Sequence, residues 1–390
     1  MRLPARSPAV VLVLASALAA GCGAAAPSAR PPAAEAPPGG APFLATSLAT
    51  AAGTWAVAVM GGTAAAHNNF WQLFLRPAGR TQWKLATPPG AADNGGLVVA
   101  GAGGQSLITG FRPSQYLTYT PLVTTRNGGQ AWAPAGPLDA AVANVPDALA
   151  VAPGSGQLLA LLSGGTAKLA AAPGYTRWSR LTTQPAIAAT APGRRCGLRA
   201  LTAATFTPSG TPLLGGTCAR PGTVGVFADR NGTWQAAGPR LPAVLARQPV
   251  AVVRLASAAN QTAALLRVGD GGAARLLAAW SADNGSHWAL SAPLPLGSTR
   301  LSSVSFGAAG EAAVTLGGNR AQAIAGPGAA WRPLPALPPG TATLALGPAG
   351  TIDALAVHRS LLTVWQLSPG ASGWHASQTM DVPIQYGSSG

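Results

Sequence analysis

The residues from Ser281 to Trp288, SADNGSHW, place an acid, a histidine and a tryptophan within eight positions. A carboxylate and a histidine close together are residue types that bind metals or act as general acids and bases. A calcium loop would need further acids and a distal glutamate, which this segment lacks. The four histidines, His67, His287, His358 and His375, include no pair at the spacing of metal ligands. We therefore expect no metal and no cofactor.

Acidic residues are the other groups that could do chemistry, and the chain has only ten of them. Glycoside hydrolysis needs two carboxylates that face one pocket, one protonated and one ionised. With Glu35 and the acids of the SADNGSHW-like segments set aside, the candidates are Asp93, Asp139, Asp147, Asp270, Glu311, Asp353 and Asp381. Most of them stand beside glycine or in loop-like sequence, which is typical of turns. The acids therefore favour a protein without catalysis, and a glycoside hydrolase is kept as the alternative.

The SADNGSHW segment recurs along the chain. Two good copies share a hydroxyl, an acid or amide, a glycine and a tryptophan: Ser281, Asp283, Gly285 and Trp288 in one, and Thr125, Asn127, Gly129 and Trp132 in the other. A third copy, Asp229–Trp234, has its glycine one position later. Degenerate copies end at Trp83, Trp178, Trp331 and Trp374, and the seven tryptophans are about 48 residues apart on average. A period of this size is typical of the blades of a β-propeller.

The segments between these tryptophans have the composition of strands and turns. Fifty glycines and 36 prolines interrupt the chain too often for many helices, and the apolar runs between them are short and rich in Val, Leu and Thr. We predict an all-β fold, a β-propeller of four-stranded antiparallel blades, with seven blades favoured and six or eight open. Val250–Val268 is the longest stretch without Gly or Pro, and a helix there is the competing interpretation.

The motif Ser281-x-Asp283-x-Gly285-x-His287-Trp288 resembles the Asp-box of sialidase-like propellers, with histidine in place of the usual threonine. The resemblance implies that the box joins the third and fourth strands of a blade, that its acid caps turn amides, and that its tryptophan packs between blades. Sialidases also need an arginine triad and a Tyr–Glu pair. Phe111-Arg112-Pro113 lacks the isoleucine of the sialidase arginine motif. The resemblance thus implies an architecture rather than an activity.

The amino terminus carries targeting signals. A basic start and a short apolar stretch lead to Leu18-Ala-Ala-Gly-Cys22, which resembles the lipobox of bacterial lipoproteins, in which the cysteine is lipidated. We predict a signal peptide over 1–21, a disordered Ala/Pro/Gly tether over 22–42, and one propeller domain over 43–390. The protein is then expected to be anchored through a lipid on Cys22 at the outer face of the cytoplasmic membrane.

Cysteine usage and charge add further expectations. Cys196 and Cys218 lie 22 residues apart around a predicted hairpin, and in an exported chain they predict a disulfide. The net charge is +15, but the arginines are scattered rather than clustered with aromatics, which argues against nucleic acid as a partner. We expect a monomer that acts as a non-catalytic binding or scaffold protein at the cell envelope. It would bind a protein or glycan through loops, with His67–Phe70 and Arg112–Tyr119 as candidates. Its basic charge would also allow non-specific contact with anionic lipid or cell-wall polymer.

Overall fold

The computed structural model describes residues 46–61, 69–89, 96–101, 106–111, 122–135, 145–258, 260–317 and 319–383. The chain divides into two compact units, Met1–Pro37 and Pro38–Gly390, and every described residue belongs to the second. Within these ranges no helix has the length and apolar character needed to cross a membrane. The predicted boundaries at residues 21 and 42 lie outside the described ranges and stay predictions.

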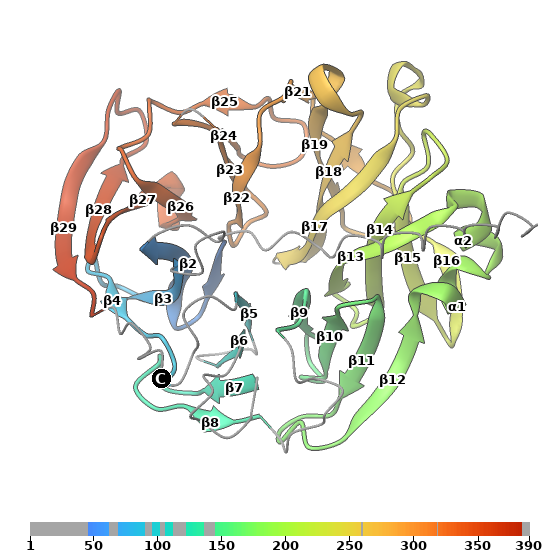
Figure 1. Ribbon diagram of the computed structural model, residues 1–390, viewed down its shortest axis with the longest axis horizontal. Coiled ribbons are helices and arrows are strands. Elements are labelled where there is room, and N and C mark those ends of the chain that lie inside the picture. Colours follow the sequence, from blue (N-terminus) through green and yellow to red (C-terminus); the bar gives the residue numbers. More distant parts are fainter. Residues whose placement is uncertain are drawn as a thin grey trace, which may run out of the picture. The chain divides into compact units, whose positions relative to one another are not determined.

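The described strands form seven blades that follow one another around a ring (Figure 1). The first three blades contain β1 (Ser47–Thr50), β2 (Gly53–Gly61), β3 (Asn69–Pro77) and β4 (Lys84–Leu85); β5 (Leu97–Gly101), β6 (Leu107–Phe111), β7 (Leu122–Thr125) and β8 (Ala133–Pro134); and β9 (Ala148–Val151), β10 (Leu158–Leu162), β11 (Thr166–Ala170) and β12 (Trp178–Thr183). In each of them the strands are paired in sequence order and antiparallel.

The other four blades repeat this pattern. They contain β13 (Leu198–Phe206), β14 (Pro212–Cys218), β15 (Gly225–Arg230) and β16 (Thr233–Ala236); β17 (Val250–Ala258), β18 (Gln261–Val268), β19 (Arg275–Ser281), β20 (Ala289–Leu290) and β21 (Leu294–Pro295); β22 (Leu301–Phe306), β23 (Ala312–Leu316), β24 (Arg320–Ile324) and β25 (Arg332–Pro333); and β26 (Thr341–Leu346), β27 (Ile352–His358), β28 (Leu361–Leu367) and β29 (His375–Asp381). In the fifth blade β20 and β21 both pair with β19 and together form the outer strand.

The predicted all-β propeller is confirmed, and the helix considered for Val250–Val268 is wrong. That stretch forms the hairpin β17–β18, whose pairing runs from Val250↔Val268 to Ala258↔Gln261. The fourth and fifth blades also merge into one nine-stranded sheet, because Thr217 and Cys218 of β14 pair with the start of β17. Seven blades therefore correspond to six hydrogen-bonded sheets.

The hydrophobic core lies between the blades. Seven clusters of buried side chains are present in the described chain, and each joins residues of two neighbouring blades. A strand in such a ring is covered on both faces, so β10 reads as an uninterrupted buried run, LLALL, without a polar alternation. This double burial explains why the strands of the chain are apolar runs rather than alternating ones.

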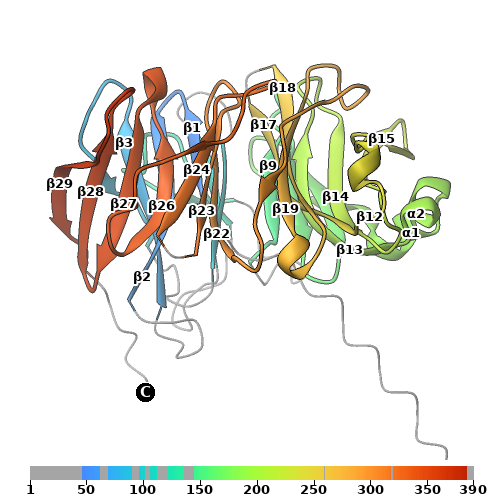
Figure 2. The same cartoon turned by 90° about the horizontal axis from the view of Figure 1, so that it is seen from above.

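Strand polarity gives the ring two different faces. The inner strands β1, β5, β9, β13, β17, β22 and β26 all begin on one side, where the connections between blades also lie. We call this side the connector face, and the opposite side, where the inner strands end, the cavity face. Figure 2 shows the strands running between the two faces. The turns between the third and fourth strands of each blade lie on the cavity face.

Two short helices, which the sequence did not lead us to expect, connect the third and fourth blades. They are α1 (Gln184–Ala188) and α2 (Ala191–Cys196), each with a threonine that caps its first turn and a proline within that turn. The disulfide predicted between Cys196 and Cys218 is present, with a Cα–Cα distance of 4.9 Å, and it ties α2 to the end of β14. The hairpin β13–β14 that it flanks is also present.

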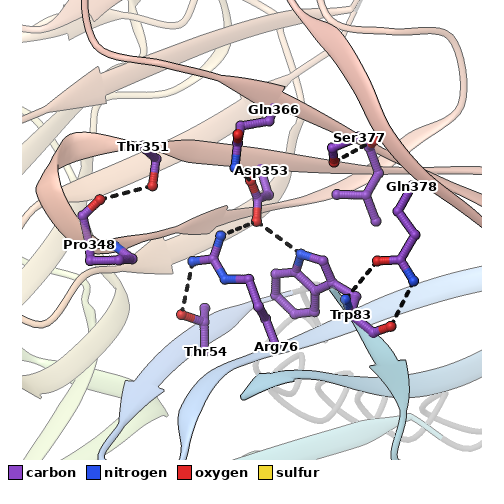
Figure 3. Close-up of polar contacts among 10 residues, drawn as sticks. Thr54, Arg76, Trp83, Pro348, Thr351, Asp353, Gln366, Ser377 and Gln378 are labelled. Carbon is purple, nitrogen blue, oxygen red and sulfur yellow. Dashed lines mark hydrogen bonds and ion pairs between the residues drawn. The ribbon is translucent and has the colours of Figure 1, made fainter. Parts of the chain in front are cut away.

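Ring closure depends on side chains from the first and last blades, because each of these blades uses only its own strands in the described chain. Asp353 of β27, 1% exposed, accepts from Nη1 of Arg76 at 2.5 Å and from Nε1 of Trp83 at 2.9 Å (Figure 3). Gln378 of β29 exchanges two hydrogen bonds with the backbone of Trp83, at 2.7 and 2.8 Å. We call these four residues the closure cluster.

The closure cluster is tightly enclosed. The guanidinium of Arg76 lies 5.4 Å from the centroid of the Trp83 ring and also bonds Thr54 Oγ1. Gly347 passes beside it, and a Cβ at this position would lie 2.4 Å from Nη2 of Arg76. The remaining oxygen of Asp353 accepts from Gln366 Nε2 at 3.2 Å. Both charges are therefore paired and hydrogen-bonded, the condition under which a buried ion pair is tolerated.

We expect Arg76→Met or Asp353→Asn to lower the free energy of unfolding by about 3–5 kcal/mol, because either change leaves the other charge buried without its partner. The double variant should lose less than the sum of the two single variants, since it leaves no unpaired charge. Urea denaturation measures all three, with exposed Arg332→Met as the control. Single variants within about 0.5 kcal/mol of the parent would show that the pair does not hold the ring closed.

Candidate functional site

A cavity of ≈ 480 Å³ occupies the cavity-face end of the ring centre. Six of the seven blades line it, mainly with the last residues of their inner strands: Thr46–Ala51, Val99–Gly101, Leu149–Val151, Thr205, Arg254–Ala258 and Phe306–Ala308. The volume falls in the range of small-ligand pockets. The lining is apolar apart from hydroxyl groups, backbone groups and one arginine.

The strand β26 of the seventh blade does not contribute to this lining. Beside β26, Ser305 connects the inner strands through hydrogen bonds. The backbone N–H of Ser47 donates to Ser305 Oγ at 3.1 Å, and that hydroxyl donates to the carbonyl of Leu344 at 2.6 Å. One side chain thus links the inner strands of the first, sixth and seventh blades. This arrangement fixes the cavity wall close to the ring closure.

Arg254 is the only charged residue in the cavity lining. It stands in the middle of β17, and in the described chain no hydrogen bond or ion pair holds its guanidinium. Protein surrounds the side chain, part of whose surface stays open to the cavity, and burial lowers the pKa of Arg254. An unpaired charge in such surroundings is costly for folding. A cost of this kind is typical of a group that a ligand completes.

Asp147 lies near Arg254 without pairing with it. Both residues border a small pocket of ≈ 30 Å³ next to the cavity. Asp147 is buried at the start of β9, where burial raises the pKa of its carboxyl group and a hydrogen bond from Ser163 Oγ, at 3.4 Å, opposes the shift. The large cavity itself is lined by no carboxylate from the described residues.

The other candidate acids in the described chain lie apart from one another, and none of them lines the cavity. Asp353 belongs to the closure cluster, and Glu311 accepts from the backbone N–H of Ala309 at 3.0 Å within a turn. Asp270 and Asp381 are exposed at the edges of the fifth and seventh blades. Asp93 and Asp139 lie outside the described residues. The described chain therefore brings no two carboxylates together with arginines at one end of the channel.

The two good copies of the Asp-box motif have the same hydrogen-bond geometry. Ser281 Oγ accepts from the N–H of Gly285 at 2.9 Å, and Thr125 Oγ1 accepts from the N–H of Gly129 at the same distance. Two residues later, Asp283 Oδ1 accepts from the N–H of His287 at 2.8 Å, as Asn127 Oδ1 does from Ala131 at 2.9 Å. Both turns join the third and fourth strands of a blade.

These contacts make Asp283 a turn residue. The exposed carboxylate bonds the backbone N–H of His287 and its ring Nδ1, and these bonds, the backbone one first, hold the pKa of Asp283 well below its usual range. Gly285 has a φ of 84° in the left-handed region, and Asn284 has a φ of 59°. The carboxylate of Asp283 therefore stabilises the turn, and it does not line the cavity.

The third copy, Asp229–Trp234, adopts a different turn. Asp229 pairs with Trp234 and Arg230 with Thr233 across β15 and β16, so only Asn231 and Gly232 form the loop. Both have positive φ, 54° and 78°, which is the signature of a two-residue type I′ hairpin. Because the glycine stands one position later than in the good copies, Asn-Gly falls at the hairpin centre. Asp229 caps no turn amide, and its Oδ1 is buried without a hydrogen bond in the described chain.

The repeated tryptophans each contact the preceding blade. Trp288 donates to the carbonyl of Ala237 at 2.8 Å, Trp331 to Ser291 Oγ at 3.2 Å, and Trp374 to the carbonyl of Pro335 at 3.3 Å. Trp83 reaches Asp353 of the last blade in the same way. The other three pack into the interblade clusters, with Trp132 edge-on to Trp55 at 6.5 Å: Trp132, Trp178 and Trp234.

Several predicted functional positions are outside the described residues. They are Cys22, His67, Asn68 and Arg112–Tyr119. Phe70 itself is buried in β3. Sequence reasoning missed Arg254, although the run VAVVRLASA carries a signal, a charged residue within an otherwise apolar strand. Arginines occur along the whole chain, so Arg254 did not stand out among them.

No protein-family model and no curated protein matches this chain. Among solved structures, a protein from Lactobacillus plantarum has a TM-score of 0.51 at 9% identity, over 84% of this chain and 96% of that one. YCF48 from Cyanidioschyzon merolae has a TM-score of 0.50 at 12% identity, covering 85% and 97%. YCF48 bound to a D1 peptide has a TM-score of 0.46 at 16% identity, covering 80% and 90%.

The first two of these likenesses show the fold, a β-propeller similar to YCF48. Identities of 9–16% carry no activity from one propeller to another, because this architecture hosts many unrelated functions. The function must therefore be argued from the cavity and surfaces of this chain.

We expect Asp283→Asn to leave the fold nearly unchanged at neutral pH, because Asn127 makes the same turn contact in the other good copy. Trp288→Ala should lower the free energy of unfolding by about 2–3 kcal/mol, since it removes a partly buried ring from the cluster between the fourth and fifth blades. The depressed pKa of Asp283 stabilises the parent above the unfolded-state value of about 4, and this contribution disappears as the pH falls through the folded-state pKa.

Urea denaturation at about pH 7 and about pH 3 checks both expectations. The parent should lose more stability on acidification than Asp283→Asn does, because only the parent has a carboxylate to protonate at this turn. Loss of ligand binding by Asp283→Asn with an intact fold would contradict the structural role of the motif.

Proposed function

We propose that this chain is an exported, lipid-anchored β-propeller that binds a carboxylate-bearing protein or peptide in the cavity at the ends of its inner strands, without catalysis. The observation that carries the proposal is Arg254, an unpaired guanidinium in a mostly apolar cavity of ≈ 480 Å³. An arginine binds a carboxylate with two parallel hydrogen bonds, which supplies both charge and orientation. Burial strengthens that interaction relative to the same pair in water.

The cavity lining supports a partner whose remaining surface is apolar. Leu48, Leu149, Leu255 and Phe306 provide apolar surface, while Thr50, Thr205 and Ser257 provide hydroxyl groups at intervals around the wall. Side chains on inner strands are held more rigidly than loop residues, which favours a preformed site. The end of a peptide chain, a carboxylate beside small side chains, fits this combination of charge and apolar wall.

The same lining argues for binding rather than hydrolysis. A two-carboxylate mechanism needs an acid and a second carboxylate about 5–10 Å apart at the scissile bond. In the described chain Asp147 is the one carboxylate near the cavity, and it borders the adjoining small pocket. A single acid beside a single arginine supplies neither retaining nor inverting chemistry.

The location belongs to the same proposal. The stretch Leu18–Cys22 supports lipidation of Cys22, and the Ala/Pro/Gly-rich sequence after it supports a tether to the propeller. The disulfide between Cys196 and Cys218 suits an oxidising compartment outside the cytoplasm. We propose that the propeller is a monomer at the outer face of the cytoplasmic membrane.

We expect an acetylated tri-alanine peptide with a free carboxylate to bind the purified protein, and Arg254→Met to weaken this binding at least tenfold, which corresponds to about 1.4 kcal/mol. The same peptide with an amidated end should bind the parent and Arg254→Met equally weakly. Titration calorimetry measures the difference, and exposed Arg332→Met, which removes the same charge, should bind like the parent.

Arg254→Met should also unfold at the same temperature as the parent or about 2 °C higher, because an unpaired charge is removed from a partly enclosed site. Loss of binding therefore cannot be attributed to a damaged fold. Equal binding of the carboxylate and amide peptides by the parent would contradict the proposed role of Arg254.

We expect metabolic palmitate labelling of the full chain in a bacterial host to disappear in Cys22→Ala, because the thiol is the acceptor of the lipid. The double variant Cys196→Ala/Cys218→Ala is the matched control and should keep its label, since it removes two cysteines but leaves the acceptor. Labelling that persists in Cys22→Ala would remove the anchor from the proposal and leave the peptide-binding measurement untouched.

A further inference from the structure

The connector face of the fourth blade carries a concentration of arginines that the proposed cavity function does not use. Residues 184–249 contain seven arginines and one acid, Asp229, which lies toward the cavity face at the end of β15. We call five of the exposed arginines, together with the apolar turn between them, the basic patch: Arg194, Arg195, Arg220, Arg240, Arg247 and the turn Pro242–Val244. Within the described chain none of these arginines forms an ion pair.

Backbone hydrogen bonds hold the parts of the patch together. The N–H of Arg220 donates to the carbonyl of Cys196, next to Arg195, at 3.0 Å. The N–H of Gly222 in the same loop donates to the carbonyl of Gln248, next to Arg247, at 2.8 Å. The helix α2 also packs beside β15 and β16, as Figure 1 shows. Three separate connections of the chain therefore present their arginines as one surface.

An exposed apolar turn stands between the arginines. The short 3₁₀ helix Ala243–Leu245 is anchored by Leu245, which is 3% exposed. This anchor turns Val244 outward, where it is 82% exposed, far more than Leu85 and Leu361, the other large hydrophobics exposed in the described chain, at 37% each. Arg240 precedes this turn and Arg247 follows it. An apolar tip flanked by arginines is the chemistry that binds the interface of an anionic bilayer, with the tip among the acyl chains and the arginines at the headgroups.

We propose that the basic patch binds the surface of an anionic lipid membrane and turns the cavity face away from it. The partner is identified by complementary charge and by the exposed valine, since a soluble acidic polymer would have no use for an apolar tip. The orientation deepens the proposed function, because the lipid on Cys22 would keep the chain at the bilayer. Strand polarity agrees, since β1, the first described strand, also starts on the connector face.

The test uses the full chain with Cys22→Ala, which removes the lipid and leaves the patch as the membrane-binding element. Sedimentation with vesicles of equal parts phosphatidylglycerol and phosphatidylcholine measures binding, with pure phosphatidylcholine vesicles as the neutral comparison. We expect binding to the anionic vesicles alone, and loss of most of it between about 0.1 M and about 1 M salt, where electrostatic screening becomes short-ranged.

Matched variants separate the patch from net charge. Arg220→Glu/Arg247→Glu should reduce vesicle binding more than tenfold, since each arginine near an anionic surface contributes roughly fivefold. Arg80→Glu/Arg332→Glu changes the net charge equally at exposed positions toward the cavity face and should bind nearly as the parent does. Val244→Asp should weaken binding severalfold, whereas the corresponding change at the seventh blade, Leu361→Asp, should not.

Equal loss of vesicle binding in the two double-glutamate variants would overturn the proposal, because binding would then follow overall charge. Binding of soluble polyglutamate without binding of anionic vesicles would also overturn it, in favour of an acidic polymer. Because every protein in this comparison lacks the lipid, its outcome is independent of the palmitate labelling at Cys22 and of peptide binding at Arg254.

Discussion

The ion pair between Arg76 and Asp353 closes the ring, and the rest of the structure depends on that closure. In the described chain the first blade and the last blade each complete themselves with their own strands, so no shared strand joins them. The fourth and fifth blades show the alternative, because β14 and β17 are hydrogen-bonded into one sheet. At the closure, side chains 277 residues apart replace that backbone pairing. Near the closure, Ser305 of the sixth blade links the inner strands of the first and last blades beside the cavity wall.

Arg76 and Arg254 show how one residue type serves two purposes in two environments. Arg76 is 6% exposed, and its guanidinium contacts a carboxylate, a hydroxyl and an aromatic ring. Arg254 lines the cavity, and in the described chain its guanidinium has no hydrogen-bond or ion-pair partner. The first arrangement satisfies a buried charge, so that loss of either partner destabilises the fold. The second leaves a charge unsatisfied at a cost to stability, which a protein tolerates where a ligand supplies the missing interaction.

The sequence predicted those parts of the fold that local interactions decide. The turn of the Asp-box is held by bonds between residues four positions apart, so Ser281 and Gly285 disclose it directly. The spacing of the tryptophans predicted the blades for the same reason, because every blade repeats the same succession of antiparallel strands. The third copy failed where a one-residue shift of Gly232 selects a different hairpin. Arg76, Asp353 and Arg254 could not be identified, because their roles come from neighbours that lie far away in the sequence.

The two faces of the propeller place their binding groups on different kinds of support. Arg254 projects from the middle of β17, where it pairs with Leu265 of β18, so its backbone is held in the sheet and the site is preorganised for a partner of defined shape. Arg220 and Arg247 project from loops, where long side chains can adapt to a fluid surface at little cost. Arg254 lies four residues beyond the start of β17 at Val250, about 13 Å along the strand at 3.3 Å per residue, and this half of the strand separates the two supports. A rigid cavity and adaptable arginines on the connector face suit one specific partner and one extended surface.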